Sequence, residues 1–307
     1  MSAIICDISE FLRENGFDCV VEPRGEMTVL WAELLDETLT EASGEKPARS
    51  MNTKPARRCI VPWPVVAGSP EEAQEQAQRV AELLRELSAE GYRPIIITED
   101  RWRRQPEMMR ARLLAHLEVF IPMFARNCEV RKIDKETAAA FLNENHSYGD
   151  AACRYRYGLY LKRYTGKRGE SGVTPGTLVA VATFSNARKW QKGEKTIRSY
   201  EWTRYASLPG VRISGGMGKV LKAFIKEIQP DDIMSYADLE WSEGAVYEQL
   251  GFRLEGRKAP VAFEVDGSWG RSPVKPGMTD EGNESHAARY LQNLGSNKYR
   301  LKLTEYE

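Results

Sequence analysis

The sequence predicts an α/β (α+β) protein in which a mixed sheet flanked by helices follows a smaller N-terminal α/β module. Three observations predict it: β-branched runs alternate with amphipathic helical segments, a glycine-rich turn leads directly into a helix, and the 307 residues exceed the length of most single domains. We therefore expect an N-terminal α/β module over residues 1–125, a main domain over 126–270 and a polar C-terminal extension over 271–307.

Composition favours a folded, soluble, cytoplasmic protein. Hydrophobic residues make up 42% and charged residues 29% of the chain, a balance that can build a core and argues against disorder. No apolar stretch approaches the roughly 20 residues that span a bilayer, so we expect no membrane partner. The five cysteines are scattered without a CxxC pair and no two of the three histidines are four residues apart. We therefore expect neither a disulfide framework nor a metal site.

The N-terminal module shows alternating helix and strand signals. Ser69, Pro70 and Glu72 form the pattern of a capping box with proline at the first helical position, which predicts a helix from this point. The apolar run at residues 93–98 predicts a buried strand, and Pro106 begins another predicted helix. The other elements expected here are a short helix near residues 7–16 and a strand at 17–21.

Two acidic residues, Glu99 and Asp100, follow the buried strand directly. Carboxylates at such a strand end could bind a metal ion or position a nucleophile, which would suit a metal-dependent nuclease. The alternative is structural: the two residues cap the following turn or pair with arginines nearby in the sequence.

The main domain is predicted from a longer series of signals. The expected elements, in order, are strands at 129–133, 154–161, 178–184, 195–207, 232–237, 252–254 and 260–265, and helices at 135–143, 219–228 and 242–250. A polar turn at residues 146–149 follows the first of these helices.

A glycine-rich turn joins the strand at 195–207 to the next helix. A helix N-terminus presents unpaired backbone N–H groups and the positive end of its dipole, and glycines let a ligand approach the backbone closely. This pattern predicts an anion site suited to a phosphate group, although a turn that only starts a helix is the alternative. The residues expected to hold the ligand are Gly215, Gly216, Met217, Gly218 and Lys219.

Residues 129–265 resemble the GCN5-related N-acetyltransferase (GNAT) superfamily. The resemblance rests on the order strand, glycine turn, helix, strand and short helix, on Gly216-x-Gly218, and on the phrase YEQLGF at 247–252. Ile213 stands where the family's turn has Arg or Gln, and Arg212 lies one place early. The resemblance implies a GNAT-like fold, acetyl-CoA or a related acyl-CoA as cofactor, and acyl transfer to an amine.

The sequence SYAD at 235–238, followed by WSEG at 241–244, is similar to a phage and mobile-element branch of that superfamily. This branch includes the Mom-type proteins that modify adenine in DNA. The resemblance implies catalytic roles for His146, Asp238 and Tyr247, with the phenol donating a proton to the leaving thiolate and the carboxylate accepting the amine proton. The alternatives are an exposed histidine, an aspartate that caps the helix near Ser242, and a tyrosine that only packs.

The middle of this neutral protein is basic. Residues 150–222 contain 15 Lys and Arg against 4 Asp and Glu, interleaved with aromatic residues. Cations mixed with aromatic rings suit a nucleic-acid backbone and an unstacked base, so we expect DNA or RNA as a partner. Ordinary alternation of a strand's two faces is the alternative explanation. The expected contacts are Arg154, Arg156, Arg188, Lys189, Trp190 and Arg204.

These signals together predict a GNAT-like acyltransferase that moves an acyl group from a CoA-type donor to an amine, which could belong to a nucleobase. Two alternatives remain open. One is a nucleic-acid-binding protein that has this fold without catalysis, and the other is the nuclease centred on Glu99 and Asp100. The sequence does not indicate the oligomeric state.

Overall fold

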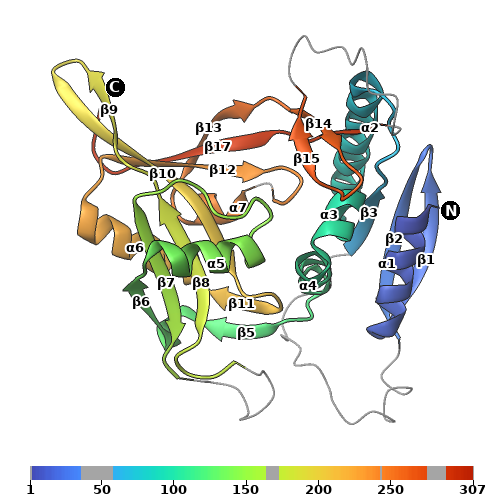
Figure 1. Ribbon diagram of the computed structural model, residues 1–307, viewed down its shortest axis with the longest axis horizontal. Helices are drawn as coiled ribbons and strands as arrows, with labels where there is room; N and C mark the ends of the chain where they lie inside the picture. The colour runs from blue at the N-terminus through green and yellow to red at the C-terminus, as the bar shows by residue number, and fades with distance from the viewer. Residues whose placement is uncertain (1, 36–57, 164–172, 243, 275–287, 307) are drawn as a thin grey trace. The chain divides into compact units, whose positions relative to one another are not determined.

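The computed structural model describes residues 2–35, 58–163, 173–242, 244–274 and 288–306. The chain forms two compact units that are interleaved in sequence (Figure 1). The first unit comprises Met1–Val119, Leu239–Trp241 and Ala259–Gly295, and the second comprises Phe120–Asp238, Ser242–Lys258 and Ser296–Glu307. These units differ from the division expected at residues 125 and 270, because the chain passes between them five times.

The first unit contains two small sheets and four helices among the described residues. Its elements are α1 (Ala3–Glu14), β1 (Phe17–Arg24), β2 (Met27–Leu34), β3 (Arg58–Trp63), α2 (Pro70–Ala89), β4 (Arg93–Thr98), α3 (Glu99–Arg104), α4 (Pro106–His116), β14 (Ala262–Val265), β15 (Arg271–Pro273) and β16 (Arg289–Gln292). One sheet has the order β1-β2-β3-β4, in which β3 and β4 are parallel, and the other has the order β15-β14-β16. Strand β14, which we expected in the main domain, belongs here.

Helices α2 and α4 of the first unit begin where the sequence predicts, whereas α1 begins at Ala3 and not near residue 7. Ser69 Oγ accepts a hydrogen bond from the Glu72 amide at 3.2 Å, and the Glu72 carboxylate accepts one from the Gly68 amide at 2.7 Å. This confirms the serine cap at the start of α2, whereas Glu72 bonds the amide one residue before the cap and not that of Ser69, which a capping box would use. The residues of α2 that follow bury Val80 and Leu87 against the sheet. The predicted buried strand and the helix that begins at Pro106 are also confirmed as β4 and α4.

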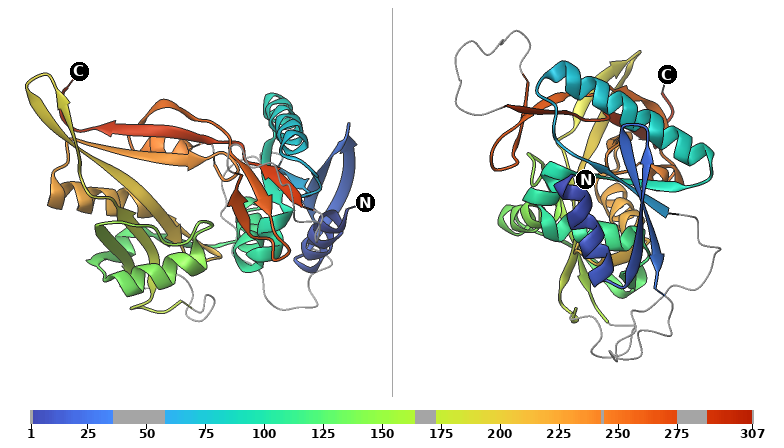
Figure 2. Two further views of the ribbon diagram at one scale, coloured as in Figure 1. Left: turned by 45° about the horizontal axis from the view of Figure 1, so that its top comes forward. Right: turned by 90° about the vertical axis from the view of Figure 1, so that its right-hand side faces the viewer.

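The second unit is built on one eight-stranded mixed sheet (Figures 1 and 2). Its elements are β5 (Ile121–Phe124), η2 (Ala125–Asn127), β6 (Cys128–Lys132), α5 (Lys135–Asn145), β7 (Tyr155–Leu161), β8 (Leu178–Phe184), β9 (Arg188–Lys192), β10 (Lys195–Ser207), β11 (Val211–Ser214), α6 (Gly216–Ile228), β12 (Asp232–Asp238), α7 (Ala245–Gln249), β13 (Arg253–Lys258) and β17 (Ser296–Lys302). The strand order is β13-β17-β12-β10-β8-β7-β6, and β9 pairs with the first part of β10.

Helices cover both faces of this sheet. Phe224 of α6 stacks on Phe184 of β8 with ring centroids 3.9 Å apart. On the alternate residues of β8, Val181 packs against Phe141 and Leu142 of α5. The predicted mixed α/β class with a large mixed sheet is confirmed. Among the described residues, no helix is long and apolar enough to cross a membrane.

Candidate active site

Strands β10 and β12 are parallel neighbours that separate partway along their length. Residues 199–201 of β10 pair with residues 232–234 of β12. Beyond this point β10 has an irregular register between Trp202 and Arg204 and pairs with β8, whereas β12 continues beside β17 to Asp238. The carboxyl-terminal halves of the two strands therefore leave their facing edges unpaired. Ligands of α/β sheets bind at such points, beyond the carboxyl ends of parallel strands that diverge.

A serine and a tyrosine close the apex of this split. Ser235 Oγ of β12 lies 2.9 Å from the carbonyl oxygen of Trp202 in β10 and 2.9 Å from the hydroxyl oxygen of Tyr247 in α7. The Tyr247 ring stacks on Tyr299 of β17 with centroids 5.4 Å apart. Burial raises the pKa of Tyr247, so its phenol stays protonated at neutral pH. The predicted proton donor thus lies at the split, and its hydroxyl group is directed into the sheet.

The glycine turn lies next to the same split. Gly215 has φ +76°, which favours glycine, and it precedes the first residue of α6. A Cβ at Gly216 would lie 2.6 Å from the Tyr205 hydroxyl oxygen of β10, and a Cβ at Gly218 would lie 3.1 Å from a Leu250 methyl group. Packing of α6 against β10 and the end of α7 therefore requires small residues here, whether or not a ligand binds.

The first amides of α6 remain available to a ligand. Within the described part of the chain, the N–H groups of Gly216, Met217 and Gly218 have no hydrogen-bond acceptor, as expected for the first turn of a helix. Lys219 differs from the prediction. Its ammonium group donates to the carbonyl oxygens of Ala125 at 2.8 Å and Cys128 at 2.6 Å. The backbone can supply the anion site, whereas the Lys219 charge serves to hold the turn onto η2.

The turn after α5 brings His146 near Asp238 through a residue that the sequence reasoning missed. The backbone N–H of Tyr148 donates to Nδ1 of His146 at 3.1 Å, and the Tyr148 hydroxyl donates to Oδ2 of Asp238 at 3.0 Å. Arg204 Nε donates to the Gly149 carbonyl oxygen at 3.0 Å and fixes the same turn to β10. A phenol two residues after a predicted catalytic histidine, in a polar turn, was the signal that could have identified Tyr148.

The six predicted nucleic-acid contacts do not form one surface. Arg156 donates to the Cys153 carbonyl oxygen at 3.0 Å, and Arg204 is bonded to backbone carbonyls beside the split. Burial lowers the pKa of Arg204. Both guanidinium groups therefore donate hydrogen bonds to backbone carbonyl oxygens of their own unit. Arg154 is exposed before β7, whereas Arg188, Lys189 and Trp190 are exposed together on β9.

In the first unit, Glu99 and Asp100 are structural. Asp100 is ion-paired with Arg271, which also contacts Glu240 at 3.0 Å. Glu99 Oε2 accepts a hydrogen bond from the Val65 amide at 3.1 Å. Arg271 holds the pKa of Asp100 below its usual value against the effect of burial. Among the described residues, no three His, Cys, Asp or Glu side chains are grouped to hold a metal ion. The carboxylates of Glu99 and Asp100 are both engaged by groups of the same unit.

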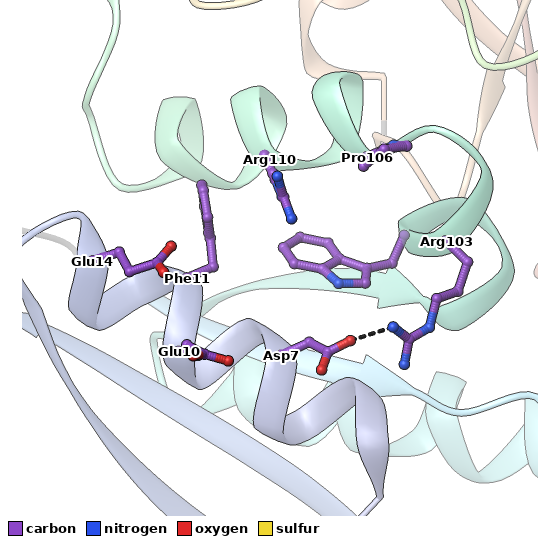
Figure 3. Close-up of a pocket in the computed structure, with 8 residues that line it drawn as sticks. Asp7, Glu10, Phe11, Glu14, Arg103, Pro106 and Arg110 are labelled. Atoms are coloured by element: carbon purple, nitrogen blue, oxygen red, sulfur yellow. Dashed lines mark hydrogen bonds and ion pairs between the residues drawn. The ribbon is translucent and has the colours of Figure 1, made fainter.

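A pocket of about 430 Å³ lies between α1 and the α3–α4 segment of the first unit (Figure 3). Arg103 pairs with Asp7 across it, and the Arg110 guanidinium carbon lies 5.5 Å from the centroid of the Phe11 ring. Trp102 meets Phe11 edge-on with centroids 5.8 Å apart. Arginines already engage a carboxylate and the ring faces in this pocket, and none of the predicted site residues lines it.

No protein-family model matches the sequence, and no curated protein matches it. Several solved structures are similar. The ribosomal-protein-S18-alanine N-acetyltransferase of Escherichia coli is 11% identical, with a TM-score of 0.33, over 59% of this chain and 96% of its own. Arabidopsis thaliana NAA60, solved with acetyl-CoA, is 9% identical, with a TM-score of 0.35, over 57% of this chain and 99% of its own. Eis1 of Mycobacterium abscessus is 13% identical, with a TM-score of 0.33, over 44% of this chain and 33% of its own.

Proposed function

We propose that the second unit transfers an acyl group from acetyl-CoA or a related acyl-CoA to an amine. The observation that carries this proposal is the split between β10 and β12, which has unpaired strand edges, the free amides of α6 beside it, and Tyr247 and Ser235 at its apex. An extended ligand with a phosphate group at one end matches unpaired strand edges followed by a helix N-terminus.

Each group at the split would have a separate role in binding or proton transfer. The N–H groups of Gly216, Met217 and Gly218 would hold the pyrophosphate, and a bound acyl-CoA would supply the thioester. That thioester would supply the acyl group, which would pass to the amine nitrogen as the carbon–sulfur bond is broken and the thiolate leaves. The Asp238 carboxylate accepts the proton that the amine loses, and the Tyr247 hydroxyl supplies the proton that the leaving sulfur gains. Tyr148 positions Asp238 through its hydrogen bond.

Donor binding can be tested at Gly215, which precedes α6. Aspartate and asparagine both tolerate the left-handed conformation of Gly215, so neither variant should lose the fold. Gly215→Asp places a negative charge beside the amides, whereas Gly215→Asn is its neutral match. We expect acetyl-CoA to raise the melting temperature of the wild type and of Gly215→Asn, but not that of Gly215→Asp. Equal responses of the two variants would contradict the proposed donor site.

Turnover can be tested separately from donor binding. Asp238→Asn should retain the acetyl-CoA response and lose at least about tenfold in rate with an amine acceptor, because general-base catalysis contributes at least this much. Tyr247→Phe should also retain donor binding and turn over more slowly. A rate unchanged in both variants would show that these two groups take no part in proton transfer.

A finer proposal is that the accepting amine belongs to a nucleobase in DNA or RNA. The basic character of residues 150–222 supports it. Mass spectrometry of nucleosides from cells that express the wild type or Asp238→Asn tests it without assuming the base. A new nucleoside that appears only with the wild type is expected, and identical nucleoside profiles would rule out this acceptor.

A nucleic-acid-binding protein without catalysis is the second candidate. Two observations favour it. The Tyr247 hydroxyl group is directed into the sheet, and the Lys219 ammonium group donates hydrogen bonds to two backbone carbonyl oxygens in place of a ligand. Salt-sensitive oligonucleotide binding without any acetyl-CoA response would identify it.

A further inference from the structure

Strand pairing in the second unit places a set of basic residues on one face of the sheet. Directly paired residues share a face, and the register links Arg188, Ser199, Asp232 and Lys302 across β9, β10, β12 and β17. The next row joins Met234, Arg300 and Arg253. The alternate residues of these strands, Ser235 and Tyr299 among them, face α7. The basic residues therefore lie on the opposite face.

A groove runs along this face between the β9–β10 hairpin and the ends of β13 and β17. It has a volume of about 1250 Å³, which exceeds the roughly 300–1,000 Å³ of sites for small molecules. Apolar Leu254 and Leu303 also line it and are 57% and 39% exposed. We call this feature the basic groove. Its cationic residues are Lys192, Lys195, Arg253, Arg300 and Lys302, which outnumber the three carboxylates that also line it, those of Glu194, Glu255 and Glu305.

The cations of the basic groove differ in how they are neutralised. Arg300 pairs with Asp232 and Glu255, each at 2.6 Å, so its charge is used within the unit. Lys192, Lys195 and Arg253 form no ion pair with any residue that the structure describes. Lys192 and Lys195 also lie directly opposite each other in the hairpin. Like charges in that position destabilise a sheet, and an external polyanion would remove this cost.

An exposed aromatic side chain lies on the same face of β9 as Lys192, outside the lining of the groove. Trp190 lies on the same face of β9 as Arg188 and Lys192 and is 50% exposed. Further along the face, Tyr236 of β12 is 37% exposed, two residues before Asp238. Exposed rings between cations are the combination that holds single-stranded nucleic acids, because bases stack on the rings while phosphates meet the charges.

We propose that the basic groove binds single-stranded nucleic acid, with phosphates on Lys192, Lys195 and Arg253 and a base stacked on Trp190. The inference goes beyond acyl transfer and does not depend on it, because no residue of the groove belongs to the proposed donor site. Strand β12 connects the two places: its first residue pairs with Lys302 at the groove, and its last is Asp238. A single-stranded nucleic acid bound in the groove would therefore lie on the same sheet as Asp238 of the proposed acceptor site.

The test is binding of a fluorescent oligothymidylate of about 20 nucleotides at several salt concentrations, measured by anisotropy with the full chain. The triple variant Lys192→Ala, Lys195→Ala, Arg253→Ala should bind at least about tenfold more weakly at low salt. Its slope of log K against log salt should fall by about 2, because each single-strand phosphate contact contributes about 0.7. Trp190→Ala should weaken binding about tenfold and leave the slope unchanged, since stacking releases no counterions.

The matched control removes two lysines elsewhere in the same unit. Lys222 and Lys226 are exposed on α6, which packs on the other side of the sheet, so Lys222→Ala with Lys226→Ala should bind as the wild type does. Circular dichroism should show all variants folded, because every substituted side chain is exposed.

Three results would overturn the inference. They are absence of oligonucleotide binding by the wild type, equal binding by the triple variant and the control, and groove-dependent binding of anionic phospholipid vesicles in place of the oligonucleotide. A duplex that binds more tightly than the single strand, with no effect of Trp190→Ala, would also contradict it. The acetyl-CoA response of the triple variant should match that of the wild type, which keeps this test separate from that of the proposed function.

Discussion

The hydroxyl group of Tyr205 occupies the space that a side chain at Gly216 would need. A Cβ at that position would lie 2.6 Å from the hydroxyl oxygen, closer than van der Waals contact allows. Gly216 thus lets α6 pack directly on β10 and leaves the first amides of the helix uncovered. Packing of α6 and access of a ligand therefore both require a residue without a side chain at position 216. Mutation can separate these two requirements.

Gly216→Ala should destabilise the protein by about 1–3 kcal/mol, the usual cost of overpacking, even though alanine favours a helix by up to about 1 kcal/mol. Tyr205→Phe removes the atom that clashes, so the alanine should cost less in that background. Urea denaturation of the four proteins in a double-mutant cycle measures the coupling. Additive effects would show that the Tyr205 hydroxyl does not limit the space at Gly216.

His116 gives a prediction about pH. Burial, together with the charges of Arg58 and Arg112, lowers its pKa to about 4, and its Nε2 atom has no hydrogen-bond partner among the described residues. The unfolded state, with a pKa near 6.5, binds the proton more readily. Stability contributed by neutral His116 is therefore present above about pH 6.5 and is lost as the pH falls toward 4.

Between pH 7 and pH 5 the wild type should lose about 2 kcal/mol more of its unfolding free energy than His116→Gln, which cannot titrate. Chemical denaturation of both proteins at the two pH values measures this difference. Parallel pH dependence would mean that His116 is as easily protonated in the folded state as in the unfolded state.

Individual site residues were predictable to the extent that their role depends on local sequence. The glycine turn, Asp238 and Tyr247 were singled out because their spacing along the chain is characteristic, and their roles in binding and catalysis stay predictions. The roles of Tyr148 and Lys219 depend on partners 90 and 94 residues away, Asp238 and Ala125. No local pattern carries that information, so Tyr148 was missed and the hydrogen bonds of Lys219 to two carbonyl oxygens were not foreseen.

At the scale of elements, α2 shows how local signals fix the start of a helix. Ser69→Ala removes the acceptor of the Glu72 amide and should cost about 1 kcal/mol of stability. Ser69→Asp should retain the cap. Ser88→Ala, at an exposed position near the end of the same helix, is the matched control and should be neutral or slightly stabilising. Thermal unfolding of the three variants measures the effect, and equal losses for Ser69→Ala and Ser88→Ala would contradict a capping role.

Strand β17 shows where local signals fail. Its sequence, SNKYRLK, is mostly polar, and we assigned it to a C-terminal extension. In the structure it lies between β12 and β13, with Tyr299 buried on one face and Lys298 and Arg300 on the other. The cations pair with Glu255 of the neighbouring strand. Because its polar residues pair with a neighbouring strand, β17 has the polar composition of an exposed C-terminal extension although it is an inner strand of the sheet.

At the scale of the whole molecule, the position of β17 predicts the effect of truncation. Ending the chain after Gly295 removes a strand that is paired on both sides, so the sheet of the second unit should not form. Ending it after Lys302 retains the strand and should give a folded, less stable protein that lacks the Tyr306–Asp232 hydrogen bond. Circular dichroism and thermal unfolding of the two proteins check this, and a cooperative transition of normal size in the shorter one would contradict it.

The interleaving of the two units also determines when each can be completed during synthesis. Domains usually fold in order from the N-terminus as the ribosome releases them. Here the first unit requires residues up to Gly295, and the second requires the strand that follows immediately. Neither unit is complete until residues 295–302 have been translated. The apolar surfaces that Val265, Leu291 and Leu294 cover in the first unit, and that Tyr299 covers in the second, must therefore stay exposed until these late residues have been translated.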